Sequence, residues 1–461
     1  MAKGSRKMLL IGILFLPFVY TTFLRMTTVY TRRNSWKFQL SIPDNLKILN
    51  SDTMLHHPSM HFSLPCMKRK ELAHDKVSCI SEPLSTMCVT TSAVRIQTGD
   101  RPVVYLSGGQ KSIGNFSQKL YPRMNDPLAM ERTTSVYVVS DSSLSDLPEC
   151  DVTHHVPALV FSTGGFAGNF YHDINEVIIP LFITVSQFQS QIQLVITDHK
   201  PYWFAKYRRV LAQVSDYDIV KASSTIIPVD TTVHCFPGAI VGVKHHHNNL
   251  VCNSSLPPGG IDTLDFKRFL QDSFSLKNSD VSLDDSKKPP VLLLLSRYKS
   301  RVILNEKEVV RVATEIGFHV EVAPPTRMRS LLDASKLVNS CNVLMGVHGA
   351  GMTNMVFLPT GAVVLQVVPL GLDWAAKVYY GKGPTERLGL KYVEYKSTAE
   401  ESSLYTQYPK DHPVLTDAWS ILRQGYNVSG PLYTNGQNVT VNIDRLRLKL
   451  SEAMQLVPRS N

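Results

Sequence analysis

The stretch of sequence that decides the fold is VLLLLSRYKSRVILNEKEVV, residues 291–310. It opens with an uninterrupted apolar run and passes through a basic loop into a segment with helix signals. Asn305 followed three residues later by Glu308 is typical of a helix N-terminus, and Gly317 is typical of a helix end. A continuous apolar strand that leads into a helix indicates a strand buried on both faces, as in a parallel sheet.

The same alternation continues downstream. HVEVAP predicts a strand at 319–324, and NVLMGV and AVVLQVVP predict strands at 342–347 and 362–369. A helix is expected over 327–339. Strands and helices in turn predict an α/β fold whose parallel sheet is covered on both faces. Ligands of such sheets bind beyond the carboxyl ends of the strands.

A second α/β stretch precedes this one. Strands are expected at 103–108, 135–140, 158–162 and 193–198, and helices at 171–188, 203–214 and 264–275. Residues 276–289, a charged Ser/Asp/Lys run closed by two prolines, have the composition of a linker. We therefore predict two facing Rossmann-like domains, residues 91–280 and 290–450, with a cleft between them.

The N-terminal residues predict a membrane anchor. Residues 8–24 are 17 residues without a charge, which is the short end of what spans a bilayer. The basic residues within 1–7 favour a cytosolic tail and therefore a type II orientation. A cleaved signal peptide is the alternative, although no small-residue cleavage site follows. Residues 25–90, rich in Ser, Thr, Asn, His and Pro, are interpreted as a stem.

The charge distribution argues against one class of partner. A net charge of +10 invites a nucleic-acid interpretation. The first 70 residues contain eleven Lys and Arg but only two acidic residues, so they carry nearly all of the excess. Because the rest of the chain is close to neutral, we do not expect a nucleic-acid binder.

The chain has the features of an oxidising, glycosylating compartment. N-glycosylation sequons occur at Asn115, Asn253, Asn427 and Asn438. The seven cysteines form no CxxC pair, so a zinc site has no support. Cys79–Cys88 and Cys235–Cys252 are short-loop disulfide candidates, but the connectivity stays open. Cys341 is expected to be a free thiol in the core.

A basic loop follows the first strand of the second domain. Arg297 and Arg301 stand just past strand 291–296. Two guanidinium groups at a strand end are suited to bind a diphosphate through paired, charge-assisted hydrogen bonds. A solvated basic loop is the alternative.

A glycine loop follows a neighbouring strand. In HGAGMTN, residues 348–354, the glycines allow close approach of the backbone, and the expected helix start offers free N–H groups to an anion. His348 is then a donor to phosphate or to a sugar hydroxyl, unless it is a structural residue of a tight turn. Strand 362–369 contributes Gln366, whereas Trp374 is expected to be an ordinary core residue.

The first domain supplies a candidate base. GGFAGNFYHD, residues 164–173, leads into a helix on which His172 and Glu176 share one face, with Asp173 on its flank. A histidine beside a carboxylate at a glycine-rich helix start is a reasonable general base, and a solvated helix face is the alternative. Pro180 should disturb this helix and free the carbonyl of Glu176.

Two patterns suggest a metal, and neither is convincing. Asp216-Tyr217-Asp218 is a DxD, but roughly one is expected by chance in a chain of this acid content. The side chains of His245, His246 and His247 are consecutive and point in different directions, so they seldom share one ion. We therefore expect no metal site.

Taken together, these motifs resemble a known family. GGFAGNFYHDINEVIIPLF, SRYKSRVILNE, MGVHGAGMTN, VVLQVVP followed by DWAAKVYYG, and the tail DHPV…QNVT are similar to the plant branch of glycosyltransferase family 61. The similarity runs from about residue 79 to residue 450. It implies a GT-B fold, a type II anchor in the Golgi membrane, a UDP-sugar co-substrate and inversion at the anomeric carbon. It also implies a cell-wall xylan acceptor and no cofactor or metal.

The resemblance assigns roles by position. It implies that the nucleotide diphosphate is held by Arg297, Arg301, His348, Gly349, Gly351, Thr353 and Asn354. His172, Asp173 and Glu176 would lie across the cleft, where the acceptor hydroxyl must lose its proton. The motif does not say which of the three is the base. Some relatives carry Asp where this sequence has Glu176, and either residue supplies a carboxylate.

The expected reaction is a pentosyl transfer to xylan, and we expect a β-1,2-xylosyltransferase that uses UDP-xylose. The alternatives are an α-1,3-arabinofuranosyltransferase that uses UDP-arabinofuranose, a xylosyltransferase of N-glycans, and a non-catalytic glycan-binding or complex subunit. Intact Arg297, Arg301 and His348 argue against the last. An assembly with other Golgi transferases fits the same interpretation. The sequence does not decide the donor sugar, the linkage, the oligomeric state or the occupancy of the sequons.

Overall fold

The computed structural model describes residues 77–106, 114–140, 147–246, 249–252, 260–281 and 288–458. The predicted tail, the anchor at 8–24, most of the stem and Asn253 lie outside these residues. Within the described residues, no helix is both long enough and apolar enough to cross a bilayer.

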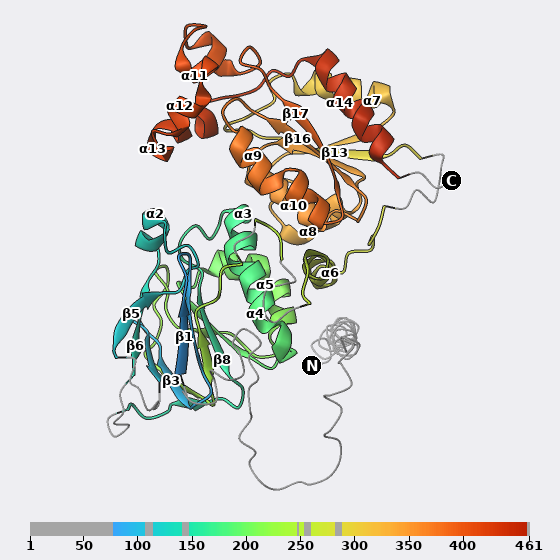
Figure 1. Ribbon diagram of the computed structural model, residues 1–461. Coiled ribbons are helices and arrows are strands. Elements are labelled where there is room, and N and C mark those ends of the chain that lie inside the picture. The colour runs from blue at the N-terminus through green and yellow to red at the C-terminus, as the bar shows by residue number, and fades with distance from the viewer. Residues whose placement is uncertain are drawn as a thin grey trace, which may run out of the picture. The chain divides into compact units, whose positions relative to one another are not determined.

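The first half of the described chain contains two six-stranded sheets (Figure 1). One has the order β1-β2-β12-β8-β9-β10, with strands Val77–Ser81, Thr86–Thr90, Ala239–Val241, Ala158–Ser162, Gln193–Thr197 and Val220–Lys221. The other has the order β5-β6-β4-β3-β11-β7, with strands Phe116–Lys119, Ser135–Val139, Val103–Leu106, Val94–Gln97, Val233–Phe236 and Val152–Thr153. In the first sheet β12, β8, β9 and β10 run parallel, and β2 joins β12 antiparallel.

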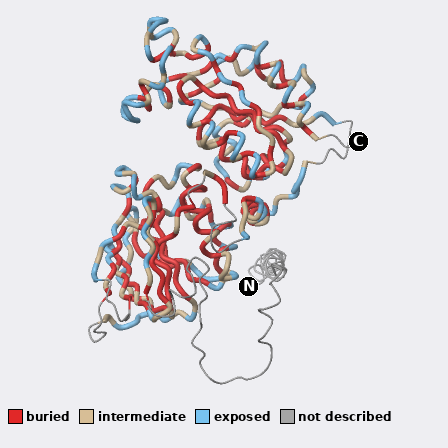
Figure 2. The backbone as a smooth tube through the Cα atoms, in the orientation of Figure 1, coloured by how far each residue is buried: buried red, intermediate tan, exposed pale blue. Residues whose placement is uncertain are grey.

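Strand β8 shows how the two sheets pack. Leu159 and Phe161 belong to the apolar cluster that contains the helices, whereas Ala158 and Val160 belong to the cluster between the sheets. A layer of helices therefore covers one face of the first sheet, and the second sheet covers the other. The predicted Rossmann-like arrangement, with helices on both faces, is wrong for this half. Figure 2 shows these strands as the buried centre of the half.

The predicted stem extends too far toward the C-terminus. Residues 77–90, which were assigned to it, form β1 and β2 at the antiparallel edge of the first sheet. Cys79 and Cys88 are directly opposite each other in this pair and form a disulfide, as predicted.

The second disulfide corrects the sequence analysis. Cys235 pairs with Cys150 and not with Cys252, because β7 lies beside β11 and brings Cys150 close. Cys252 and Cys341 are buried free thiols, which confirms the prediction for Cys341.

The helical layer of the first half is α3 (Phe170–His172), the π-helix η3 (Asp173–Ile178), α4 (Ile179–Val185), the 3-10 helix η4 (Ser186–Phe188) and α5 (Pro201–Val214). A short helix, α2 (Pro127–Glu131), precedes β6. The helices expected at 171–188 and 203–214 are therefore present, the first of them interrupted by a π-turn.

The second half is built on one parallel sheet, as predicted. Its order is β14-β13-β15-β16-β17, with strands His319–Ala323, Val291–Leu295, Val343–Val347, Val363–Val368 and Lys391–Lys396. Every neighbouring pair is parallel. The sheet explains why VLLLL is uninterrupted: Leu292 and Leu294 pack on one face, and Leu293 and Leu295 on the other.

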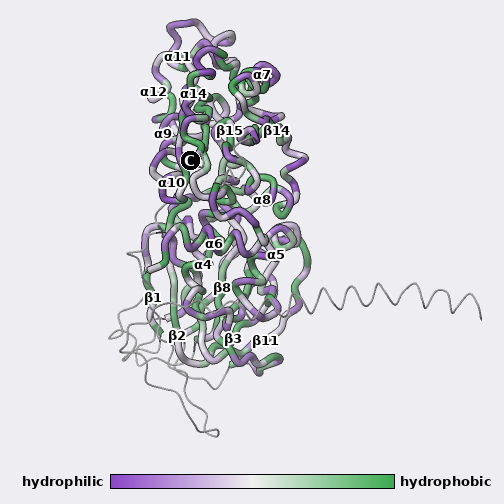
Figure 3. Tube along the Cα trace, turned by 90° about the vertical axis from the view of Figure 1, so that its right-hand side faces the viewer, coloured by the Kyte–Doolittle hydropathy of each residue, from purple (hydrophilic) through white to green (hydrophobic). Residues whose placement is uncertain are grey.

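Helices cover both faces of this sheet. Helices α7 (Glu306–Ile316) and α14 (Ile443–Leu456) lie on one face, and α8 (Leu331–Asn339), the 3-10 helix η5 (Ala350–Phe357), α9 (Asp373–Tyr380) and α10 (Lys382–Arg387) contribute to the cluster on the other. In Figure 3, α7 and α14 show polar and apolar residues in turn, as expected of helices with one buried face. The predicted capping box is not formed, because Asn305 Oδ1 accepts a bond from Val441 N–H at 3.0 Å instead.

A small helical region follows β17. It comprises η6 (Ser403–Thr406), α11 (Pro413–Thr416), α12 (Ala418–Leu422), α13 (Tyr426–Ser429) and the π-helix η7 (Gly430–Asn435). It has its own core around Leu404, Val414 and Tyr433.

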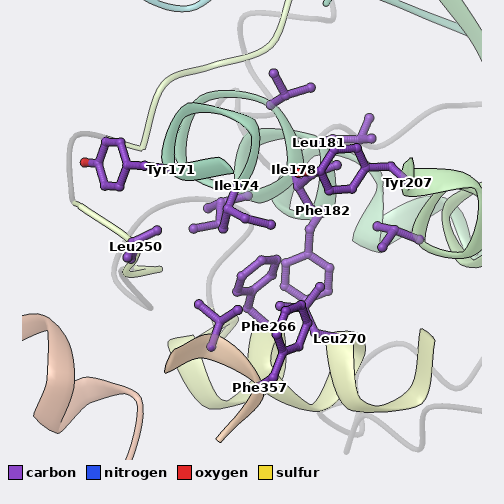
Figure 4. Packing of buried hydrophobic residues seen from close by; sticks show 14 of the residues in the cluster. Tyr171, Ile174, Ile178, Leu181, Phe182, Tyr207, Leu250, Phe266, Leu270 and Phe357 are labelled. Atoms are coloured by element: carbon purple, nitrogen blue, oxygen red, sulfur yellow. The ribbon is translucent and has the colours of Figure 1, made fainter. Parts of the chain in front are cut away.

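Helix α6 (Thr263–Ser273) joins the two halves. Phe182 and Phe266 pack with ring centroids 5.5 Å apart, and Phe357 of the second half lies in the same cluster (Figure 4). Lys267 Nζ donates to the Leu388 carbonyl at 2.8 Å. The predicted domain limit at residue 280 falls inside a segment bonded to the second half, since Val281 N–H donates to the Thr360 carbonyl at 2.8 Å.

Candidate active site

The loop after β13 brings two guanidinium groups together. Arg297 Nε donates to the Ser300 carbonyl at 2.7 Å, and Arg301 Nη1 donates to the His348 carbonyl at 2.8 Å. A Cβ added to Gly349 would lie 2.9 Å from the Nη1 atom of each arginine. The ends of β13 and β15 thus bring three of the predicted residues into contact.

No carboxylate balances the charge of these arginines. Among the ion pairs of the described residues, neither Arg297 nor Arg301 takes part. Burial, with the charge of Arg297 acting in the same direction, lowers the pKa of Arg301 to about 10. Burial also lowers the pKa of Arg297. Two adjacent, partly buried cations are costly unless an anion binds between them, so this is an anion site.

His348 lies beside the arginines as a neutral hydrogen-bond donor. Its Nδ1 is 2.8 Å from Gln366 Nε2, and Gln366 Oε1 accepts a bond from the Tyr392 hydroxyl at 2.9 Å. The amide therefore donates to Nδ1, which leaves the imidazole proton on Nε2. Burial, followed by the charges of Arg301 and Arg297, lowers the pKa of His348 to about 3. The predicted residue Gln366 thus orients His348 from behind.

The residues after His348 form the 3-10 helix η5, and not the α-helix start that the sequence predicts. The Thr353 hydroxyl is buried and lies 3.0 Å from the Tyr380 hydroxyl. Asn354 Nδ2 donates to the Gly351 carbonyl at 2.8 Å. These side chains hold the loop and α9 in place, so any contact that they make with an anion comes from their backbone.

Gln437 ties together the loops at this edge of the sheet. Its carbonyl accepts a bond from Arg301 N–H at 2.7 Å. Its Nε2 donates to the carbonyls of Leu370 and Tyr433 at 2.7 and 2.8 Å, and its Oε1 accepts from the Ser402 hydroxyl at 3.0 Å. Gln437 is fully buried, so one residue fixes the chain after β13, β16 and β17.

In the first half, a π-turn shapes the helix that carries the candidate base. Pro180 has no N–H to donate to the preceding turn. Ile179 N–H bonds the Ile174 carbonyl, five residues back, and η3 is a π-helix over Asp173–Ile178. Such turns occur frequently at functional sites.

The carboxylate of Glu176 is buried and receives three donors. Its Oε1 accepts bonds from Arg123 Nη1 at 2.6 Å and from His172 Nδ1 at 2.8 Å, and its Oε2 accepts from the Tyr121 hydroxyl. Burial opposes ionisation, but the bond and charge of His172, the charge of Arg123 and the Tyr121 bond outweigh it. The pKa of Glu176 therefore lies below its usual value. An anionic carboxylate with three donors is a poor base.

The anionic Glu176 fixes the tautomer of His172. Nδ1 carries the proton that is donated to the carboxylate, so the lone pair is on Nε2. The ring packs against Phe166 and Tyr171, with centroids 4.8 and 5.3 Å apart, and the His172 side chain is 19% exposed. His172 is thus an oriented imidazole that can take a proton from a bound hydroxyl.

Asp173 faces a different part of the structure. Its carboxylate accepts bonds from Gly168 N–H at 2.6 Å and from Trp203 Nε1 and the Tyr207 hydroxyl, each at 2.8 Å, and it pairs with Lys206 at 3.1 Å. The side chain is fully buried. The structure therefore separates Asp173 from its two predicted companions and makes it the residue that fastens the glycine loop to α5.

Aromatic rings connect the two clusters. Tyr171, next to the candidate base, has its ring centroid 4.8 Å from that of Tyr379, and Tyr379 lies 6.4 Å from His348. The Tyr380 ring lies 5.5 Å from His348. Trp374 packs against Tyr379 but is 58% exposed, so the expectation of a core residue is wrong. The anion site and the oriented histidine belong to one contiguous region.

The patterns that suggested metal binding lie elsewhere. Residues 216–218 form an exposed turn, where Gln191 Nε2 donates to the first aspartate at 3.1 Å. His245 and His246 are buried and stacked, and His247 lies outside the described residues. Among the described residues, no group of three or more His, Cys, Asp or Glu side chains is arranged to hold a metal.

The described sequons differ in exposure. Asn115 and Asn427 are exposed, the latter on α13. Asn438 is half-buried, and its Oδ1 accepts a bond from Val302 N–H at 3.0 Å. A glycan at Asn438 would therefore compete with a contact that supports the arginine loop.

Sequence analysis missed three residues that shape this site. Tyr121 and Arg123 follow β5, and both bind Glu176. A tyrosine and an arginine just after a strand are a usable signal, but the strand itself was not predicted. Tyr380 stood within a quoted motif without an assigned role.

Comparisons with known proteins identify the family. The family model for Glycosyltransferase 61 matches residues 170–365. An alpha-1,3-arabinosyltransferase of Oryza sativa subsp. japonica, XAT2, is 36% identical over 80% of this chain and 62% of its own length. A xylan glycosyltransferase of Arabidopsis thaliana, MUCI21, is 37% identical over 73% of this chain and 69% of its own.

A beta-1,2-xylosyltransferase of Oryza sativa subsp. japonica, XYXT1, is 36% identical over 73% of this chain and 71% of its own length. Among solved structures, a dodecameric iron-containing heptosyltransferase aligns at a TM-score of 0.28 and 10% identity, over 71% of this chain and 84% of its own. The chain thus spans somewhat less than two thirds of XAT2 and slightly more than two thirds of MUCI21 and XYXT1. On the similarity to the last two, the chain belongs to glycosyltransferase family 61.

Proposed function

We propose that this chain is an inverting glycosyltransferase of the GT-B type that transfers a pentosyl residue from a UDP-sugar to the xylan backbone. The observation that carries the proposal is the unbalanced Arg297–Arg301 pair, in one region with the oriented His172. The arginines require an anion, and the imidazole requires a group with an acidic proton. The diphosphate of a UDP-sugar and an acceptor hydroxyl satisfy the two requirements together.

In the proposed reaction, His172 Nε2 removes the proton of the acceptor hydroxyl as its oxygen bonds to C1 of the sugar. Attack comes from the face opposite UDP. The bond between C1 and the β-phosphate oxygen breaks, and UDP leaves with the bonding electrons. Arg297 and Arg301 stabilise the charge that develops on the diphosphate, and His348 Nε2–H donates a hydrogen bond to it. Glu176, kept anionic by Arg123, stabilises the imidazolium.

The names of the relatives support the choice of substrates. MUCI21 is named a xylan glycosyltransferase and XYXT1 a beta-1,2-xylosyltransferase. We therefore propose xylan as the acceptor and UDP-xylose as the donor. XAT2 is named an alpha-1,3-arabinosyltransferase and is equally similar, which supports UDP-arabinofuranose as the second candidate donor.

The surroundings of the reaction are also part of the proposal. We propose that the arginine pair meets the charge of the leaving UDP without a metal, and that the UDP-sugar is a co-substrate beside no other cofactor. The apolar residues 8–24 and the exposed sequons Asn115 and Asn427 support a type II anchor in the Golgi membrane, with this fold on the lumenal side.

The test incubates the full chain with UDP-xylose or UDP-arabinofuranose and xylohexaose, and determines the mass and linkage of the product. A single added pentose with release of UDP supports the proposal, and the linkage selects between the two donors. Absence of transfer and of UDP release with both donors would contradict it and favour a non-catalytic subunit. Loss of activity in EDTA that Mn²⁺ restores would contradict the metal-free form of the mechanism.

A further inference from the structure

The glycine loop beside the candidate base carries more positive charge than the base requires. The ring of Phe166 lies 4.8 Å from that of His172, with Arg123 Cζ at 5.5 Å and Arg132 Cζ at 5.8 Å from its centroid. Arg123 is engaged, because it pairs with Glu176 and Asp126. Arg132 is exposed and takes part in no ion pair of the described residues.

Arg132 is attached to the glycine loop through its backbone. The Arg132 carbonyl accepts a bond from Gly165 N–H at 3.1 Å. A Cβ on Gly164 would lie 2.8 Å from the same carbonyl, so the loop passes directly against this residue. Arg132 therefore has a fixed position beside the surface where an acceptor must lie to reach His172.

Lys200 adds a second cation at the same edge of the sheet. Its Nζ donates to the Thr163 carbonyl at 2.6 Å, one residue before the glycine loop. Burial lowers the pKa of Lys200, the nearby charge of Arg132 acts in the same direction, and Asp198 and Asp173 oppose the shift. Lys200 too makes no ion pair among the described residues.

The carboxylates near Lys200 are committed to other partners. Asp198 accepts bonds from the Ser162 hydroxyl at 2.7 Å and from the Thr134 hydroxyl at 2.5 Å. Lys200 is also the residue that precedes the first turn of α5, a helix of 14 residues whose N-terminus has no side-chain cap. A cation is unfavourable at this end of a helix, because the N–H groups there are already positive. Lys200, Arg132 and the helix end therefore reinforce one another.

Aromatic rings line the same edge. Phe166 is half-buried, and Tyr202, on the first turn of α5, is 56% exposed. The Tyr202 hydroxyl would lie 3.3 Å from a Cβ on Gly168, so its ring follows the glycine loop. Flat apolar surface with a few fixed charges is what a charged sugar chain needs for binding.

From this arrangement we propose that Arg132 and Lys200 form a carboxylate subsite, and that the acceptor is an acidic polysaccharide carrying a uronic acid residue near the sugar that is modified. The inference rests on the proposed function, because it places the acceptor beside His172. It adds that the acceptor is anionic, and it names the side chains that bind the anion.

The test measures the affinity of the full chain, by calorimetry at low salt, for three oligosaccharides of equal length. One is a neutral xylo-oligosaccharide, the second carries a single uronate, and the third is the second with its carboxylate reduced to an alcohol. We expect the uronate compound to bind about tenfold more tightly than its reduced form, with a difference that shrinks as salt is added.

Three variants locate the preference. In Arg132→Gln and in the double variant with Lys200→Gln, the affinity ratio of the uronate compound to its reduced form should fall toward one. In Arg209→Gln, which removes an exposed cation from the same helix, the ratio should stay near ten. Arg132→Gln alone suffices if the double variant fails to fold.

Equal affinity for the uronate compound and its reduced form would overturn the subsite, and so would a preference that survives both substitutions. Failure of the transferase proposal has a different signature. Pentose transfer to the neutral acceptor needs no carboxylate subsite, so its absence would leave the binding ratio measurable.

Discussion

At the scale of single residues, the most informative feature is that one carboxylate is available to a histidine and the other is not. Glu176 binds His172 Nδ1 and is kept ionised by Arg123. Asp173, one residue from His172 in sequence, is enclosed by donors from α5 and the glycine loop. The histidine and the glutamate therefore form the acid–base pair, and the aspartate is part of the scaffold.

This assignment predicts different losses for the two members of the pair. His172→Ala removes the base and should lower kcat by two to four orders of magnitude, the usual contribution of a general base. Glu176→Gln keeps an imidazole but no longer fixes its tautomer, so we expect a smaller fall. Initial rates at saturating donor and acceptor measure both. A Glu176→Gln variant less active than His172→Ala would instead identify the glutamate as the base.

The matched control is His155→Ala, an exposed histidine that precedes β8 and so lies at the opposite end of that strand from the glycine loop. Its kcat should equal that of the unmodified chain.

His348 predicts a pH dependence of stability. Its pKa is about 3 in the folded chain and close to 6.5 in the unfolded chain. The unfolded state therefore binds a proton first as pH falls, and this group's contribution, complete above pH 6.5, is lost on the way to pH 3. Urea unfolding midpoints between pH 7 and pH 5 should decline less steeply in His348→Gln. Parallel declines in the two chains would show that His348 is not buried in its neutral form.

How far the sequence predicts such a site depends on the range of the contacts. His172 and Glu176 are four positions apart, and helical geometry alone brings them together. The partners Tyr121 and Arg123 come from a strand end more than fifty residues upstream, which no local pattern connects to them. The direction of Asp173 was likewise decided by Trp203 and Tyr207, after a strand and a loop.

At the scale of elements, the strand ends of the second half make the anion site. Gly349 has φ of 150°, which favours glycine, and any side chain there would meet both guanidinium groups. Gly349→Ala should therefore displace Arg297 and Arg301 and weaken UDP binding by about tenfold or more, a cost of about 1.4 kcal/mol or above. Calorimetric titration with UDP measures this.

Gly383→Ala in α10 is the matched control, because an added Cβ there meets nothing within 4 Å. Its UDP affinity should not change. Unchanged affinity in Gly349→Ala would mean that UDP does not bind at the arginine pair.

The elements of the second half were predicted well because a buried parallel strand has a strong signature, an uninterrupted apolar run such as VLLLL. The first half shares that signature in β8 and β9, but an apolar run does not say whether a helix or a second sheet covers the strand. That difference is set by β3, β4 and β11, which pair across long stretches of sequence. The sandwich therefore escaped prediction although its strands did not.

At the scale of the whole molecule, the two disulfides should contribute unequally to stability. Cys150–Cys235 closes a loop of 85 residues, and Cys79–Cys88 one of 9. In the chain-entropy description, the longer loop stabilises the fold by about 2 kcal/mol more. Replacing both cysteines of each pair by serine and comparing the urea unfolding free energies tests this. A larger loss from the 79–88 pair would contradict it.

Gln437 has a consequence for the order of events during synthesis. Its carbonyl holds Arg301 N–H, and its side chain spans the loops after β16 and β17. Every strand of the parallel sheet is made before residue 400, yet a growing chain that has emerged only to residue 430 lacks this connection. The strands can assemble early, but the pocket for the nucleotide becomes complete only when nearly the whole chain has been delivered. An unfinished chain therefore has a sheet without a working anion site and cannot capture donor before synthesis ends.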